Sequence, residues 1–302
     1  MKLFLIKSII FLTILWGIDM SFGIGIGEIA KKSKGGDTYP ERYIADTATE
    51  EIIIMGSSRA SHHYIPSLFK EAFNLNCYNA GTDGNGIILM YGKYKMLTEH
   101  HKPNIIVYDI FDIFDIKEDD KTKYLGRLKI YYGNKYIKNI FNDVDWKEKT
   151  KMELSRLYWY NSQITSIILN STISKKNSID GYLPLNKTID YDPEPFTIEH
   201  YKPDSLKLHY IEQLIKECDG KHKLIFTISP YFFKYDISNY NPIIELCKKY
   251  DIPILDHSND SCFIEKKDLF EDKVHLNHKG AEIYTRIIIQ EILDLLSAKH
   301  TD

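Results

Sequence analysis

The chain has 302 residues, of which 43% are hydrophobic and 27% charged, with a formal net charge of −3. A chain of this length and composition can bury a sizeable core. Its near-neutral charge excludes wholesale electrostatic attraction to nucleic acid. Tyrosine is abundant, with 22 residues, a composition compatible with interfaces or sugar-facing clefts.

The first 27 residues carry a targeting signal. Lys2 and Lys7 precede an apolar run over 8–26 that only Asp19 interrupts, close to the ~20 residues that cross a bilayer. We expect a single-pass anchor over 1–27, with the lysines inside and the rest in the periplasm or at the cell surface. Cleavage of the anchor would give a secreted protein. The alternative is a buried amino-terminal helix of a soluble protein.

The polar segment 28–50 contains Gly35-Gly36 and Pro40 and is predicted to be a linker. The folded body, expected over 51–298, alternates short β-branched runs with segments of helical periodicity. Strands are predicted at 52–55, 76–79, 104–108, 223–228 and 252–255, and helices at 66–73, 86–99, 205–218, 241–250 and 279–296. This alternation predicts a three-layer α/β/α fold with a five-stranded parallel sheet.

A long stretch, about 115–200, separates the third strand from the fourth. It is rich in Lys, Tyr, Asn and Trp, and one helix is predicted within 146–169. The stretch is too long for a simple crossover. We expect an insertion over one end of the sheet, where α/β proteins build substrate sites.

Two motifs, at opposite ends of the body, contain residues suited to nucleophilic catalysis. Gly56-Ser57-Ser58-Arg59 follows the first strand and precedes a helix, where backbone N–H groups can stabilise an oxyanion. Alone, this pattern is equally a helix N-cap. Asp272 stands three residues before His275 in a loop, a spacing that lets a carboxylate orient a general base.

Together the motifs resemble the SGNH (GDSL-like) hydrolase superfamily, over about 51–298. The resemblance implies a flavodoxin-like fold with Ser58 as nucleophile and Asp272 and His275 completing a triad. Ser57 stands where that family usually has Asp. The run His275–Gly280 matches the family's pattern after the histidine, and Tyr78-Asn79-Ala80-Gly81, after the second strand, resembles its third block. That match makes the N–H groups of Ser58 and Gly81 the expected oxyanion donors.

The family's oxyanion asparagine is missing after the third strand. Asp109 and Asp112 stand there instead, and carboxylates would repel an oxyanion. Asn85 is a candidate replacement. The same loss occurs in members that resemble the D-alanyl transfer protein of teichoic acid modification and the alginate acetyltransferases, which are also anchored outside the membrane. This shared layout favours cell-envelope polysaccharide modification.

Other polar residues have simpler interpretations. Arg59 is a candidate contact for a substrate phosphate or carboxylate, or the partner of a nearby Asp. The pairs His62-His63 and His100-His101 are expected in solvated helix ends, and the carboxylates of 109–115 in a loop with satisfied partners. His275 and His278 lack a third ligand at metal-binding spacing. No metal and no cofactor is expected.

The sequence therefore predicts a serine esterase or O-acyltransferase that acts on an acyl ester or envelope glycan, beside an integral membrane acyl donor protein in the case of transfer. The alternative is a catalytically weak or inactive SGNH scaffold that binds or presents an envelope polymer. A third hypothesis is a soluble intracellular esterase.

Overall fold

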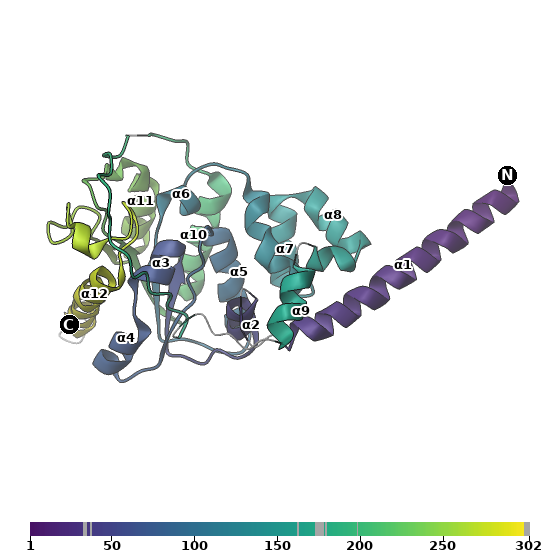
Figure 1. Ribbon diagram of the computed structural model, residues 1–302, viewed down its shortest axis with the longest axis horizontal. Coiled ribbons are helices and arrows are strands. Elements are labelled where there is room, and N and C mark those ends of the chain that lie inside the picture. Colours follow the sequence, from purple (N-terminus) through teal and green to yellow (C-terminus); the bar gives the residue numbers. More distant parts are fainter. Residues whose placement is uncertain are drawn as a thin grey trace. The chain divides into compact units, whose positions relative to one another are not determined.

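A five-stranded parallel sheet forms the centre of the fold in the computed structural model, which describes residues 1–32, 35–36, 38–161, 163–172, 178, 180–197 and 199–298 (Figure 1). The strand order is β2-β1-β3-β4-β5, and every pairing is parallel. The strands are β1 Ile52–Gly56, β2 Cys77–Asn79, β3 Ile105–Asp109, β4 Lys223–Ile228 and β5 Ile254–Asp256. The predicted α/β class and all five strands are confirmed.

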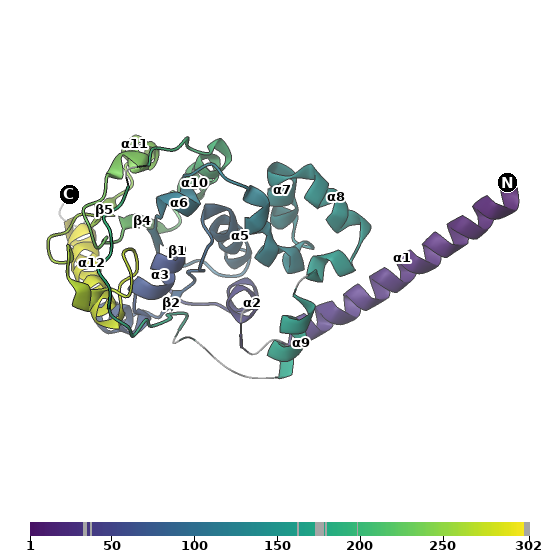
Figure 2. The same ribbon diagram turned by 45° about the horizontal axis from the view of Figure 1, so that its top comes forward.

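Helices cover both faces of the sheet. Figure 2 shows α12 and α5 on opposite sides of the strands. One face carries α3 Ser58–His63, α4 Pro66–Phe73 and α12 His278–Ala298, and the other carries α5 Ile87–Leu97, α10 Ser205–Cys218 and α11 Asn241–Tyr250. Shorter helices are α6 Asp112–Asp115, η3 Ile237–Tyr240 and η4 Lys267–Leu269. The carboxyl ends of the strands are thereby left for loops.

The core explains why the strand sequences are continuously apolar. Alternate residues of the strands, such as Ile54 and Val107, pack with Tyr284 and Ile288 of α12. The residues between them, such as Ile53 and Ile106, are also fully buried. A parallel sheet covered on both faces needs apolar residues at every position of its strands.

The chain divides into two compact units. The sheet and its helices belong to the unit of Thr47–Asp120 and Ser178–Asp302, and the other unit comprises Met1–Asp46 and Lys121–Asn177. The second unit contains α1 Lys2–Ala30, α2 Tyr39–Asp46, η1 Lys121–Tyr131, α7 Lys135–Val144, α8 Trp146–Leu154, η2 Leu157–Tyr160 and α9 Ile164–Thr172. A helix, α2, thus lies inside the predicted linker. Of the insertion predicted over about 115–200, residues 121–177 group with α1, and their position over the sheet stays a prediction; residues 115–120 and 178–200 belong to the unit of the sheet.

The prediction of a single helix over 146–169 is wrong, because α8 ends at Leu154 and two separate helical segments, η2 and α9, follow it. Asp19 of α1 accepts hydrogen bonds from Ser155 Oγ at 2.7 Å and from the Arg156 N–H at 2.6 Å. These bonds hold the segment between α8 and η2 against α1, and η2 begins there. Arg156 also packs on Gly23, since a Cβ there would lie 2.3 Å from its side chain.

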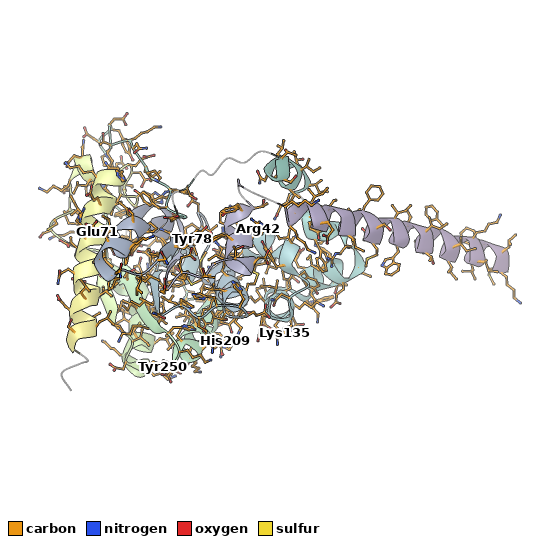
Figure 3. The ribbon with its side chains drawn as sticks, turned by 90° about the horizontal axis from the view of Figure 1, so that it is seen from below. Arg42, Glu71, Tyr78, Lys135, His209 and Tyr250 are labelled. Carbon is orange, nitrogen blue, oxygen red and sulfur yellow. The ribbon has the colours of Figure 1, made fainter. Side chains whose placement is uncertain are left out.

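The helix α1 is long and apolar enough to cross a membrane. The large apolar side chains from Leu3 to Ile18 are 46–73% exposed, and Figure 3 shows them projecting outward along this part of the helix. Asp19, the one acidic residue within 8–26, accepts hydrogen bonds from Ser155 and Arg156 of the insertion. The amino-terminal apolar helix is therefore confirmed.

Candidate active site

The turn between β1 and α3 places Ser58 at the carboxyl edge of the sheet. Ser57 is the N-cap of α3 and Ser58 its first residue, 8% exposed. Gly56, which ends β1, has φ +139°, and a Cβ there would lie 2.5 Å from the Asp109 carbonyl oxygen. Only glycine fits this position, because a side chain would be strained and would collide with β3.

The structure brings the three predicted triad residues together. Ser58 Oγ lies 2.8 Å from Nε2 of His275, and Nδ1 of His275 lies 2.8 Å from Oδ2 of Asp272. These distances make a continuous hydrogen-bonded chain from carboxylate to hydroxyl. Burial raises the pKa of Asp272, but its bond to His275 and two backbone N–H groups outweigh that effect and the pKa is lowered. Asp272 is therefore ionised at neutral pH.

Backbone hydrogen bonds fix the loop that contains Asp272 and His275. Asp272 Oδ1 accepts from the N–H groups of Val274 at 2.8 Å and His275 at 2.9 Å. The Leu276 N–H donates to Nε2 of His63 at 2.9 Å. Burial, followed by the nearby charge of Arg59, holds the pKa of His63 well below its ordinary value. A neutral His63 thus acts as an acceptor that ties the loop to the nucleophile helix.

Gly81, the predicted oxyanion donor, lies against helix α3. A Cβ on Gly81 would be 2.5 Å from the Ser61 nitrogen, so the loop after β2 touches the backbone of α3. The Gly81 N–H donates to Oδ1 of Asn79 at 3.0 Å. To donate to an oxyanion, the Gly81 N–H would have to give up its bond to Asn79 or be shared between the two acceptors.

Asn85 and the aspartates at and after the end of β3 form hydrogen bonds with other protein groups. The Asn85 amide donates to the Asp83 carbonyl at 2.9 Å, within its own turn. Asp109 accepts from Tyr64 at 2.5 Å, Asp112 from Tyr235 at 2.7 Å, and Asp115 from the Ile87 N–H at 2.7 Å. Each of the three carboxylates has hydrogen-bond donors, as expected, but Oδ1 of Asp109 is buried without one in the described part of the chain, and the residues lie in β3 and α6 rather than in a loop. The oxyanion role of Asn85 stays a prediction, and in this structure its amide stabilises the turn that contains it.

Arg59 pairs with an aspartate, which is one of the two alternatives that its sequence position allowed. Its side chain is fully buried, with Nε 3.7 Å from Asp109 Oδ1. The guanidinium also donates to the Ser229 carbonyl and lies over the rings of Phe111 and Tyr231, at 5.0 and 4.4 Å. A buried group cannot meet a substrate from solvent. The alternative of a substrate contact is therefore wrong for this structure.

His62 and His63 are buried, so their predicted place in a solvated helix end is wrong. Their exposed fractions are 7% and 0%. The His62 ring meets the His275 ring edge-on at 5.7 Å, and its Nε2 lies 3.3 Å from Asp83 Oδ1. Burial opposes the charge on His62, but Asp83 outweighs it and the pKa of His62 is raised. Its spacing of four residues from Ser58, one helical turn, was the available signal.

No protein-family model and no curated protein matches the sequence. Among solved structures, one that is similar is a protein assigned to the G-D-S-L family of lipolytic proteins, from Desulfitobacterium hafniense DCB-2. It is 8% identical, with a TM-score of 0.37, over 80% of this chain and 98% of that chain. A second is described as a platelet activating factor from Streptococcus pneumonia, 11% identical, with a TM-score of 0.39, over 91% and 96%. Similarities this low carry no argument about activity, which rests on the geometry above.

Proposed function

We propose that this protein is a membrane-anchored serine esterase or O-acyltransferase of the SGNH type, acting on a cell-envelope glycan or a related ester. The observation that carries the proposal is the hydrogen-bonded chain from Asp272 through His275 to Ser58. A nucleophile, a base and an orienting acid at hydrogen-bond distance are the requirement for acyl transfer through a covalent intermediate.

In the first half-reaction, Ser58 Oγ attacks the acyl carbonyl carbon while its proton passes to Nε2 of His275. The ionised Asp272 stabilises the imidazolium that forms. The Ser58 N–H lies in the first turn of α3, where helical N–H groups have no intrahelical acceptor, and donates to the oxyanion together with the Gly81 N–H. The bond to the leaving alcohol then breaks, and His275 returns the proton to the leaving oxygen.

In the second half-reaction, His275 takes a proton from water or from a sugar hydroxyl. The resulting oxygen nucleophile attacks the acyl carbon, the bond to Ser58 Oγ breaks, and Ser58 regains its proton. Water as acceptor gives hydrolysis, whereas a hydroxyl of an envelope polymer gives transfer. An integral membrane protein would supply the acyl donor in the case of transfer.

The amino-terminal helix supports membrane attachment. Most of the exposed large apolar residues of α1 lie before Asp19, and Phe22 and Ile24 extend the exposed apolar surface beyond it. Burying this surface in lipid removes it from water. In the proposed topology, Lys2 and Lys7 lie on the inner side and the catalytic unit lies outside the cytoplasm. Recovery of the full-length protein from the membrane fraction, with the catalytic unit cleaved by protease added outside, tests this topology.

The catalytic proposal is tested by labelling the full-length protein with a fluorophosphonate. The Ser58→Ala variant is expected to lose all labelling. Ser57→Ala is the matched control: within the described part of the chain, the Ser57 hydroxyl is buried and has no hydrogen-bond partner, so its loss should leave labelling intact. Labelling that survives in Ser58→Ala would remove Ser58 as nucleophile.

One observation favours the second candidate, a weak or inactive scaffold that binds or presents a polymer. The Gly81 N–H is already bonded to Asn79, and Asp109 and Asp112 accept rather than donate. Loss of a single oxyanion donor costs about 10²–10³ in kcat. Complementation decides between the two: full rescue of a deletion phenotype by Ser58→Ala would assign the protein to binding rather than catalysis.

A further inference from the structure

A small cavity lies beside the proposed triad, lined by residues that follow β3 and β4. Its volume is about 180 Å³. Five of its thirteen described lining residues are aromatic: Phe111, Phe196, Tyr201, Tyr231 and Tyr235. The cavity is smaller than the roughly 300–1,000 Å³ of sites for drug-sized ligands. It suits one ring or a short chain.

The cavity wall is fixed to both ends of the triad. Val274, which lines it, directly precedes His275, and its N–H is bonded to Asp272. On the other side, the rings of Phe111 and Tyr231 flank the guanidinium of Arg59, the residue after Ser58. The cavity wall is thereby connected, through adjoining residues, to the loop of His275 and to the helix of Ser58.

A buried carboxylate organises the aromatic wall. Asp112 is fully buried and accepts from the hydroxyls of Tyr201 and Tyr235. The rings of Tyr231 and Tyr235 stack in parallel with centroids 4.1 Å apart, and Phe196 meets Tyr235 edge-on at 5.3 Å. Several bonds to one acceptor fix these rings before any ligand arrives. Asp112 is in this sense a positioning residue.

The rim of the cavity is polar and has no net charge. Lys117 pairs with Glu199 at 3.1 Å, and Lys234 and Asp236 add one charge of each sign. Asn239 contributes a side-chain amide. An acyl chain would gain nothing from such a rim, since charged groups are costly to desolvate against an apolar ligand. A sugar ring presents apolar C–H faces to aromatic rings and hydroxyls to polar side chains.

We propose that this cavity binds one neutral sugar ring of the substrate, with its face on the aromatic wall and its hydroxyls at the rim. The proposal rests on the esterase or acyltransferase function above and names the chemical class that the site recognises. The sugar is either the carrier of the ester that is cleaved or the acceptor whose hydroxyl attacks the acyl-enzyme.

The test uses full-length Ser58→Ala protein in detergent, which cannot turn a substrate over. Binding is measured by calorimetry with neutral tetrasaccharides of glucose, mannose, galactose and N-acetylglucosamine, and with hexanoate as a short acyl chain. We expect binding of at least one tetrasaccharide. Addition of Tyr235→Ala should weaken that binding at least tenfold, because it removes an aromatic face. The matched control is Tyr191→Ala, an exposed tyrosine outside the cavity lining, which should bind as the parent does.

A second variant guards against a folding defect in Tyr235→Ala. Ile113 lines the cavity and is 41% exposed, so Ile113→Trp can fill the space without disturbing the core. We expect it to abolish sugar binding. Binding of hexanoate in place of every sugar, absence of sugar binding, or normal sugar binding by Ile113→Trp would each overturn the proposal.

Hydrolysis of 4-nitrophenyl acetate by the unmodified protein separates this proposal from the one it rests on. Hydrolysis that depends on Ser58, without sugar binding, overturns the sugar site alone. Sugar binding that Ile113→Trp abolishes, without hydrolysis or fluorophosphonate labelling, supports the cavity as a carbohydrate site and removes the catalytic function.

Discussion

Replacement of Asp272 by asparagine tests the proposed triad at the hydrogen bond between Asp272 and His275. Oδ1 of Asp272 accepts from two backbone N–H groups, and Oδ2 faces Nδ1 of His275. In the asparagine variant only the amide oxygen can accept from the backbone. The amide nitrogen must then face Nδ1, which has to become an acceptor. The His275 proton moves to Nε2, where it blocks abstraction of the Ser58 proton.

The size of the effect follows from this forced tautomer. An Asp→Asn change that leaves geometry intact in a serine triad lowers kcat by about 10⁴, or about 5.4 kcal/mol in the barrier at 1.36 kcal/mol per tenfold. The Asp272 side chain is 44% exposed, so solvent weakens the electrostatic part. We expect a loss of about 10³–10⁴, dominated by the tautomer.

The assay is kcat for 4-nitrophenyl acetate. Asp272→Ala should lose less than Asp272→Asn, because it leaves Nδ1 free to keep its proton. Asp268→Asn is the matched control, since that carboxylate is exposed and pairs with Lys279. An asparagine variant that keeps a tenth or more of the parent kcat would refute the reasoning.

Three further changes have expected outcomes. Gly81→Ala should lower kcat about 10²-fold by pushing a proposed oxyanion donor away, since its Cβ would clash with the α3 backbone; an unchanged kcat would remove Gly81 from that role. Arg59→Met should destabilise the fold by about 3–5 kcal/mol, because Asp109 stays buried without its cation. Thermal melting measures this loss, with Arg286→Met as the control. That substitution removes an exposed i,i+4 ion pair with Glu282 and should change stability by less than about 0.5 kcal/mol. Asp19→Leu should speed tryptic cleavage within 121–172 by freeing the insertion from α1, and an unchanged digestion pattern would contradict that contact's importance.

The sheet was predictable because its strands carry their signal locally. Runs such as 52–55 and 105–108 are apolar and mostly β-branched, which is the pattern of a strand buried on both faces. The Asp272–His275 spacing was also a local signal, since three residues of loop suffice to bring the carboxylate to Nδ1. The insertion was predicted less well, because its break at Ser155 depends on Asp19, which is 136 residues away in the chain.

Polar residues in α3 were misjudged for the same reason. A sequence of Arg, Ser and two histidines suggests a solvated helix, yet Arg59, His62 and His63 are all buried. Each is accommodated by a partner far along the chain: Asp109 for Arg59, Leu183 for His62 and Leu276 for His63. Burial of a polar group requires such partners, and periodicity does not record them.

The sequence by itself determined the fold class, the two candidate catalytic motifs and the apolar amino-terminal helix, because each depends on neighbouring residues. Only the tertiary structure decided that Ser58 and His275, 217 residues apart, lie within a hydrogen bond. It alone also decided that a cavity with three tyrosines in its lining adjoins the loop of His275 and that the insertion packs on α1. These are contacts between distant segments: the order of strands in the sheet brings the first two together, and hydrogen bonds to Asp19 make the third.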